Sequence, residues 1–315
     1  MFNTPILFLI FNRPEATAKV FAEIRKQKPK YLYIGADGPR DAVPPDAELC
    51  KRCREIAMGV DWDCEVKTLF RELNMGAKYA VSSAITWFFD HVEYGIILED
   101  DCLPGSSFFP YCEELLLRYR DDDQIMHITG ANLNDSVKYG NGTYYYSEYP
   151  NVWGWATWKR AWDKIDLELT DTNRYLALIK KKFKYFSERL FWVSRMALCK
   201  SNQVDSWDYP WMFSIWKENG ICLNSNYNLV ENIGFGREST HTKGNSVYLT
   251  PEVKVIKSIE HPLHSTIIPK AEAAFIYSLH AIKRQNVFEF YLRKYFIQRC
   301  MNLRHKISLK IKNGF

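Results

Sequence analysis

The sequence has 315 residues, of which 47% are hydrophobic and 25% are charged, and its formal net charge is +5. This composition is typical of a globular protein with an ample core. No apolar window of roughly 18 residues occurs, so the sequence predicts no membrane-spanning helix.

The positive charge is concentrated at the C-terminus. From Arg284 to Phe315 there are eight basic residues against one acidic residue, so this tail carries +7 and the rest of the chain carries −2. A local excess of this kind argues against a general nucleic-acid groove. It predicts a tail that contacts something anionic.

The eight cysteines do not form a recognisable framework. Only Cys50-x-x-Cys53 has close spacing, in a charged stretch without a second pair, which favours reduced thiols in a cytosolic protein over zinc or disulfides. The run from Met1 to Arg13 lacks the basic region and the cleavage site of a signal peptide. We interpret it as containing the first strand.

The first hundred residues alternate short apolar runs with segments of helical periodicity. Apolar runs predict four strands, at Pro5–Phe11, in the stretch Tyr31–Pro39 with Asp37 at the strand's end, at Cys64–Phe70 and at Ile96–Leu98. Helical spacing predicts helices at Glu15–Gln27, from about Asp46 to Gly59, and after Arg71 to about Asp90. Alternation of this length predicts a doubly wound, mostly parallel α/β sheet flanked by helices.

Polar side chains follow each of these strands. They are Asn12 and Arg13, then Asp37, then Arg71 and Asn74, and finally Glu99, Asp100 and Asp101. Since the carboxyl ends of parallel strands meet at one edge of a sheet, we expect these side chains to face a common crevice, as in a nucleotide site. The sequence contains neither GxGxxG nor a P-loop, which disfavours an ordinary dinucleotide or NTPase fold.

Three consecutive acids end the fourth strand. Glu99, Asp100 and Asp101 repel one another unless a cation or another partner neutralises them. Taken alone, the triplet leaves two interpretations open, a divalent-metal site and a solvated acidic turn.

Further along, Ser107–Tyr119 predicts a helix, Ile125–Gly130 a strand, and Gly140–Gly142 a turn into another strand. Four tryptophans then occur within ten residues, from Trp153 to Trp162. Such density either fills a core or builds an aromatic platform for a sugar or base.

The stretch from Val204 to Phe213 places Asp205 and Asp208 among aromatic residues, after a basic helical region. Either acid could be a helix N-cap or a general base in a desolvated pocket. Short strands are predicted at Ile221–Leu223 and Tyr227–Val230. A Gly-rich loop then contains His241, which is either a metal ligand or a hydrogen-bonding residue.

Taken together, these motifs resemble the GT-A nucleotide-sugar glycosyltransferases, most closely the N-acetylglucosaminyltransferase I type. The resemblance covers residues 3 to 245. It rests on these pieces in order: Glu99-Asp100-Asp101 before Pro104 and Phe108-Phe109, Tyr149-Pro150, Gly154-Trp155, Trp207-Asp208 before Trp211-Met212, and Phe235-Gly236-Arg237 before His241.

The resemblance implies a GT-A (Rossmann-like) fold that uses Mn²⁺ or Mg²⁺. By position, Asp101 would ligate the metal, and Asp208 would be the catalytic base, with Asp205 in reserve. The resemblance implies that Arg13 and Asp37 hold uridine and ribose, and that Glu99 and Asp100 contact the donor sugar and nucleotide. We expect Asn12, Arg71, Asn74 and Lys78 to complete the nucleotide-sugar contacts. The implied sugar or acceptor contacts are Trp153, Gly154, Trp155, Trp207, Arg237 and His241. The sequence departs at the family's uracil-stacking His, where Ser82 or a neighbour falls, and at Tyr209-Pro210 after the Trp-Asp pair.

We therefore expect an inverting transfer of GlcNAc or a related hexose from a UDP-sugar to a hydroxyl of a glycan or lipid-linked glycan. Residues 1–262 would form the GT-A domain, with a nucleotide-binding half (1–130) and an acceptor-binding half (131–262). Alternatives are a non-catalytic carbohydrate- or nucleotide-binding module and a sugar nucleotidyltransferase. The latter would usually bring a Gly-rich basic loop after its first strand.

Residues 263–315 are expected to form a helical tail after a linker bracketed by Pro262 and Pro269. Its interleaved basic and apolar residues predict an amphipathic helix on an anionic bilayer, or a homodimer interface. The first alternative suggests a bacterial-type polysaccharide enzyme, cytoplasmic and peripheral on the inner face of the membrane.

Overall fold

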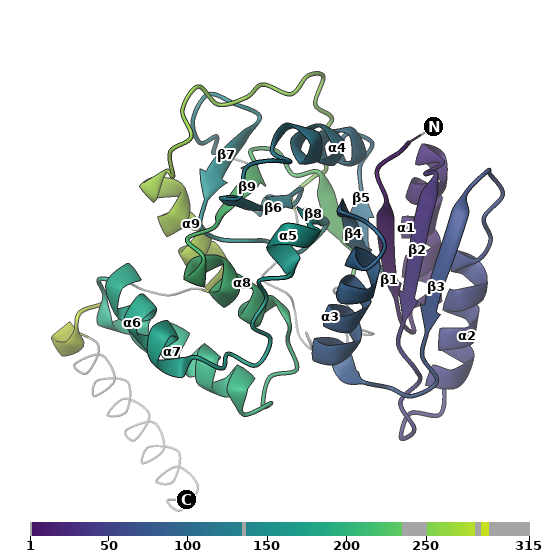
Figure 1. The fold of residues 1–315 in the computed structure, drawn as a ribbon, viewed down its shortest axis with the longest axis horizontal. Helices are drawn as coiled ribbons and strands as arrows, with labels where there is room; N and C mark the ends of the chain where they lie inside the picture. Colours follow the sequence, from purple (N-terminus) through teal and green to yellow (C-terminus); the bar gives the residue numbers. More distant parts are fainter. Residues whose placement is uncertain (1, 134–136, 235–250, 281–284, 290–315) are drawn as a thin grey trace, which may run out of the picture.

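The computed structural model describes residues 2–133, 137–234, 251–280 and 285–289. An eight-stranded sheet forms its centre, in the order β3-β2-β1-β4-β8-β6-β9-β7 (Figure 1). The strands are β1 Ile6–Ile10, β2 Tyr31–Ala36, β3 Glu65–Phe70, β4 Tyr94–Glu99, β6 Ile125–Thr129, β7 Tyr144–Ser147, β8 Trp155–Trp158 and β9 Ile221–Ser225. A separate antiparallel pair joins β5 Cys102–Pro104 to β10 Val230–Asn232.

The described helices are α1 Pro14–Gln27, α2 Asp46–Ala57, α3 Gly76–Phe89, α4 Phe108–Arg118, α5 Lys159–Trp162, α6 Thr172–Lys182, α7 Phe186–Lys200, α8 Asp208–Lys217 and α9 Pro269–His280. The four strands β3, β2, β1 and β4 are mutually parallel, and β6 and β9 continue in the same direction. Only β8 and β7 run antiparallel to their neighbours. The predicted α/β, Rossmann-like, mostly parallel sheet flanked by helices is therefore confirmed.

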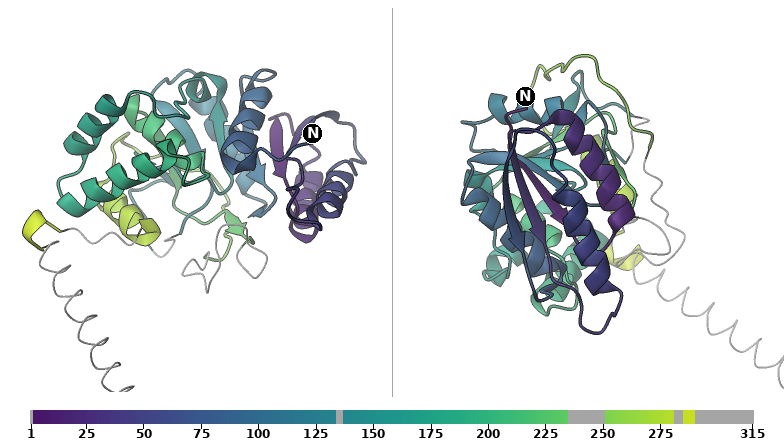
Figure 2. Two further views of the ribbon diagram at one scale, coloured as in Figure 1. Left: turned by 90° about the horizontal axis from the view of Figure 1, so that it is seen from below. Right: turned by 90° about the vertical axis from the view of Figure 1, so that its right-hand side faces the viewer.

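The two faces of the sheet are both covered, which explains the continuous apolar run of β1. Ile6 and Phe8 point into a core shared with α1, α2 and α4, whereas Leu7 and Leu9 point into a second core shared with α3, α5 and α8. Successive side chains of a strand alternate between faces, so a strand buried on both sides must be apolar throughout. Figure 2 shows α1 and α2 side by side on the first face.

A third core lies under α6, α7 and α8, away from β1. Trp192 of α7 contacts Phe183 and Trp216 there, and all three rings are buried. The predicted basic helical region is consequently two helices, because α6 ends where Phe183 turns to extended backbone and places its ring in this core. The strand β8, within the tryptophan-rich stretch, was not predicted.

The C-terminal predictions are tested only in part. The helix α9 begins at Pro269, the end of the predicted linker. Residues 290–315 lie outside the described part of the chain, so membrane contact and the dimer interface stay predictions, as does the division of residues 1–262 at residue 130. Among the described residues, no helix is long and apolar enough to cross a membrane.

His127 on β6 gives the fold a pH dependence that can be measured. Its ring is fully buried and stacks on Trp155 with 4.9 Å between centroids. Its Nε2 donates to the carbonyl oxygen of Asn151 at 3.0 Å, so Nδ1 is the acceptor for Trp211 Nε1 at 3.3 Å. Burial lowers the pKa of His127 from 6.5 to about 3.

We expect this group to make the folded state less stable as the pH falls from about 6.5 towards 3, because only the unfolded chain binds the proton there. The contribution reaches about 4 kcal/mol at the acid end of this window. Denaturant titrations of wild type and His127→Gln across this range should give a flatter pH dependence for the variant. Parallel curves would contradict the assignment.

Candidate functional site

The order of the strands reverses at β1, and a cleft opens there. The chain proceeds from β1 to β2 and β3 on one side, and β4 then pairs with β1 on the other, with Leu9 opposite Glu99. Crevices at the carboxyl ends of two such strands are the usual ligand sites of open α/β sheets. The cleft has a volume of about 240 Å³.

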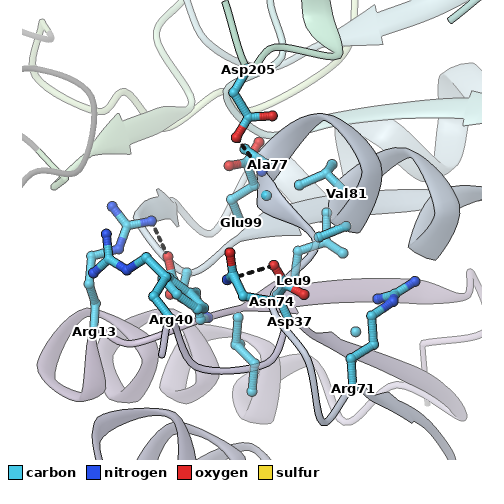
Figure 3. Close-up of a pocket in the computed structure, with 16 residues that line it drawn as sticks. Leu9, Arg13, Asp37, Arg40, Arg71, Asn74, Ala77, Val81, Glu99 and Asp205 are labelled. Atoms are coloured by element: carbon cyan, nitrogen blue, oxygen red, sulfur yellow. Dashed lines mark hydrogen bonds and ion pairs between the residues drawn. The ribbon is translucent and has the colours of Figure 1, made fainter. Parts of the chain in front are cut away.

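The lining of the cleft comes from the ends of β1, β2, β3 and β4, the start of α3, and one later segment (Figure 3). It comprises Leu9, Ile10, Phe11, Arg13, Gly35, Asp37, Arg40, Arg71, Asn74, Gly76, Ala77, Ala80, Val81, Glu99, Asp100 and Asp205. Six of the predicted nucleotide-sugar contacts are in this set, and the expected convergence of the strand ends is observed.

Arg13 links the ends of β1 and β4. It forms ion pairs with Asp100 and with Asp101, the second at 2.6 Å between Nη1 and Oδ2. Asp100 is only 2% exposed and also accepts from the backbone N–H of Phe11 at 3.0 Å. The guanidinium therefore neutralises part of the charge of the acid triplet.

Burial and mutual repulsion nevertheless raise the pKa of two acids of the triplet. Burial, then the charge of Asp101, raises the pKa of Glu99 to about 8, although Arg13 opposes the shift. Burial likewise raises the pKa of Asp100 to about 6, against the effect of Arg13. The charge of Asp208 is the smallest of the named contributions that raise the pKa of Glu99.

The acids of the cleft supply few ligands for a divalent cation. Within the described residues, no group of three His, Cys, Asp or Glu side chains could hold a metal ion. Asp101 uses Oδ2 for Arg13, whereas its Oδ1 meets the Cys102 thiol, a weak donor, at 3.5 Å. One available carboxylate fits Mg²⁺ or Mn²⁺ only if phosphate oxygens and water complete the shell, as is common for Mg²⁺.

Gly234 lies against this ion pair. A Cβ at this position would come within 2.2 Å of Asp101 Oδ2 and 2.9 Å of Arg13 Nη1. Backbone after β10 therefore approaches Asp101 as closely as a glycine permits.

Asp37 organises the opposite wall of the cleft. It accepts hydrogen bonds from Gly38 N, from Met75 N at 3.0 Å and from Asn74 Nδ2 at 2.9 Å. Burial raises its pKa in spite of these bonds. Arg71 donates to Ser83 Oγ at 2.8 Å from the same wall. Asp37 thus fixes the loop that leads into α3.

Two predicted nucleotide contacts lie outside the cleft. Asn12 donates to Asp46 Oδ1 at 2.8 Å, at the start of α2. Lys78 is 1% exposed, and its ammonium donates to Glu168 at 3.0 Å and to Asn202 at 2.9 Å. Both side chains have structural partners in place of a nucleotide.

The aromatic platform predicted for a sugar is instead part of the core. Trp155 is fully buried, and Trp207 is 5% exposed and stacks on it with 5.5 Å between centroids. Trp153 packs against the main core, and Gly154 has a φ of +64° with Val230 where a Cβ would stand. For Trp155 and Trp207 the core alternative is correct, because buried rings offer no face to a ligand.

Asp205 and Asp208 occupy different positions. Asp208 is the first residue of α8 and accepts from Ser206 Oγ. Asp205 lines the cleft and accepts from the backbone N–H groups of Ala77 and Lys78, each at 2.7 Å. It is therefore a cap, as one alternative predicted, but for α3 and from a distant part of the chain. Arg237 and His241 lie outside the described residues.

Several lining residues were missed from the sequence. Arg40 lies over the ring of Phe11, 5.4 Å from its centroid, and pairs with Asp46. Both follow strand ends, the same signal that identified Arg13 and Asp37. Where the resemblance placed a stacking His, Ser82 is buried and donates to the Lys78 carbonyl at 2.6 Å, while its neighbours Ala80 and Val81 line the cleft.

Comparisons with known proteins add little. No protein-family model matches the sequence. A search of curated proteins found no match. Among solved structures, UDP-glucose pyrophosphorylase with UDP-glucose is 10% identical, with 70% of this chain and 90% of that chain covered and a TM-score of 0.32. The apo form of UDP-glucose pyrophosphorylase is 9% identical, with 71% and 93% covered and a TM-score of 0.34. Likeness at these scores carries no argument about activity.

The burial of Asp100 makes the role of Arg13 testable by stability. We expect Arg13→Met to lower the free energy of unfolding by about 3–5 kcal/mol, because it leaves a buried carboxylate without its partner. Lys51→Met is a matched control, since the Lys51–Glu55 pair is exposed and 3.9 Å long, and should cost less than about 1 kcal/mol. Urea denaturation measures both. Equal losses would contradict the importance of the Arg13 pairs, and Asp100→Asn should recover part of the loss in the double variant.

Proposed function

We propose that this protein is a metal-dependent glycosyltransferase that moves a sugar from a nucleoside-diphosphate sugar, preferably a UDP-sugar, to an acceptor hydroxyl. One observation carries the proposal: Arg13, Glu99 and Asp100 line the switch-point cleft, and Arg13 also pairs with Asp101, the next residue of the chain. An acid cluster at this edge of a sheet suits a diphosphate that arrives with a cation.

The donor would lie along the ends of β1, β2 and β4. Asp37 and Asn74 supply polar atoms on the wall opposite the triplet, and Phe11 with Arg40 offers a flat surface for a base. Arg13 would hold Asp101 in place and add positive charge beside the diphosphate. A Mn²⁺ or Mg²⁺ ion held by Asp101 and the diphosphate would act as a Lewis acid on the leaving group.

Proton transfer is assigned to Asp208. In an inverting transfer, one carboxylate removes the proton from the acceptor hydroxyl as the hydroxyl oxygen attacks the anomeric carbon. We assign the role to Asp208 because it directly follows the buried Trp207 as the first residue of α8 and its charge contributes to the raised pKa of Glu99, although it is not among the residues that line the cleft. The proposal also includes a hexose as the transferred sugar and a glycan or lipid-linked glycan as the acceptor.

A sugar nucleotidyltransferase is the second candidate, and the neighbouring solved structures bear the name of such an enzyme. One local feature disfavours it. The connection from β1 to α1 is only Phe11, Asn12 and Arg13, with no glycine. A loop this short provides no Gly-rich cradle of backbone N–H groups for a triphosphate. The assay below includes this alternative as an outcome.

A panel of UDP- and GDP-sugars with Mn²⁺ should identify a donor by release of the nucleoside diphosphate, and chelation should abolish that release. In a parallel reaction, UTP and glucose 1-phosphate should yield no pyrophosphate. Pyrophosphate formation without diphosphate release would replace the proposal with the nucleotidyltransferase. Nucleotide binding without either reaction would favour a binding module.

Replacing the assigned base should separate binding from turnover. We expect Asp208→Asn to bind the donor normally in calorimetry while kcat falls about 10²- to 10⁴-fold, because only the proton acceptor is lost. Asp123→Asn is the control, since Asp123 is 83% exposed and pairs at 3.8 Å with Arg160. Near-normal turnover by Asp208→Asn would refute the assignment.

A further inference from the structure

The segment from Asn202 to Asp208 is fastened to the start of α3. The two carboxylate oxygens of Asp205 accept from Ala77 N and Lys78 N, both at 2.7 Å. Asn202 adds a contact to the buried ammonium of Lys78 at 2.9 Å. Figure 3 shows Asp205 reaching this helix end from the side of the cleft opposite Asp37.

The start of α3 is built to receive this carboxylate. The first N–H groups of a helix have no partner within the helix, and Met75 at the N-cap makes no side-chain capping bond. Gly76 has a φ of +77°, and a Cβ there would lie 2.9 Å from Asp205 Oδ2. A side chain at position 76 would therefore both strain the backbone and press on the carboxylate.

The other end of the segment is anchored in the core. Trp207 stacks on Trp155 and meets Trp162 edge-on with 6.1 Å between centroids. Asp208 follows directly as the first residue of α8, and the Ser206 hydroxyl donates to its carboxylate. The backbone that leads to Asp208 is thus held at two points: Asp205 binds the start of α3, and Trp207 packs on Trp155.

We propose that Asp205 is a positioning residue that sets Asp208 against the donor site by binding the N-terminal end of α3. The inference rests on the proposed function, in which Asp208 is the base. It also removes Asp205 as the alternative base, because both of its oxygens are committed to backbone donors. The helix that forms one wall of the donor cleft and the carboxylate that deprotonates the acceptor therefore share one anchor.

A double-mutant cycle tests the contact without any assay of activity. Gly76→Ala should lower the urea midpoint less in an Asp205→Ala background than in wild type, since the Cβ then no longer meets the carboxylate. Additive losses would overturn the contact. Ser206→Ala should leave the coupling unchanged, because Ser206 contacts Asp208 and not α3.

Kinetics test the role. With a donor selected from the panel of UDP- and GDP-sugars, Asp205→Asn and Asp205→Ala should lower kcat about 10- to 100-fold, while the KM for the donor stays within about threefold. The acidic limb of the kcat–pH profile should remain in place. Asp171→Asn is the matched control, since Asp171 caps α6 by accepting from Arg174 N at 3.1 Å and should affect stability alone.

The possible failures are distinguishable. Loss of the acidic limb in Asp205→Asn would make Asp205 the base and overturn the positioning role, as would an unchanged kcat. If wild type turns over no donor, the proposed function fails and the positioning role fails with it. In that case a coupled cycle would still establish Asp205 as the cap of α3.

Discussion

The ion pairs of Arg13 with Asp100 and Asp101 are the interaction on which the site depends. They join the ends of β1 and β4, the two strands between which the sheet reverses its order. Without the guanidinium, Asp100 would be an unpaired charge at 2% exposure, and such a charge strongly destabilises a fold. Even with it, burial and the charge of Asp101 raise the pKa of Glu99 to about 8, so this carboxyl keeps its proton near neutral pH.

A second constraint acts at the start of α3, where two acids meet one helix end. Asp37, directly after β2, accepts from Met75 N, and Asp205, from the segment before α8, accepts from Ala77 N and Lys78 N. Neither acid is close in sequence to the helix that it caps. Because unsatisfied N–H groups attract carboxylates, the helix end draws both sides of the cleft to a common point.

The first strands and helices of the fold could be predicted because they depend on the spacing of apolar residues that are close in sequence. The buried run of β1 and the periodic apolar residues of α1 depend on spacing alone, and the convergence of Arg13, Asp37 and Glu99 follows once the strands are parallel. Phe11 and Arg40 follow strand ends too, so a stricter use of the same rule would have found them.

Other features could not be predicted, because they depend on the direction of a side chain in the folded molecule. Lys78 is the third residue of α3, next to residues that line the cleft, yet it is buried against Glu168 and Asn202. Tryptophan is a residue type that can bind sugars, so the sequence alone could not assign a role to Trp155. Its burial beneath Trp207 in the folded protein shows that it belongs to the core. The partner of Asp205 lies more than a hundred residues away, and no local pattern encodes such a contact.

The acid triplet follows the sheet strand β4, whereas Asp208 follows the segment that Asp205 anchors to α3, and this difference has a chemical consequence. A transfer reaction requires precise positions of the leaving group and the proton acceptor relative to each other. A misplacement of about 1 Å lowers the rate strongly. In the proposed transfer, the acids of the donor side end a central strand, whereas the proposed base Asp208 begins a helix that also packs against the third core. Sheet pairing cannot align these two groups, because α8 is not part of the sheet. The alignment must pass through side-chain contacts, and the described residues provide them where Asp205 meets α3 and where Trp207 meets Trp155.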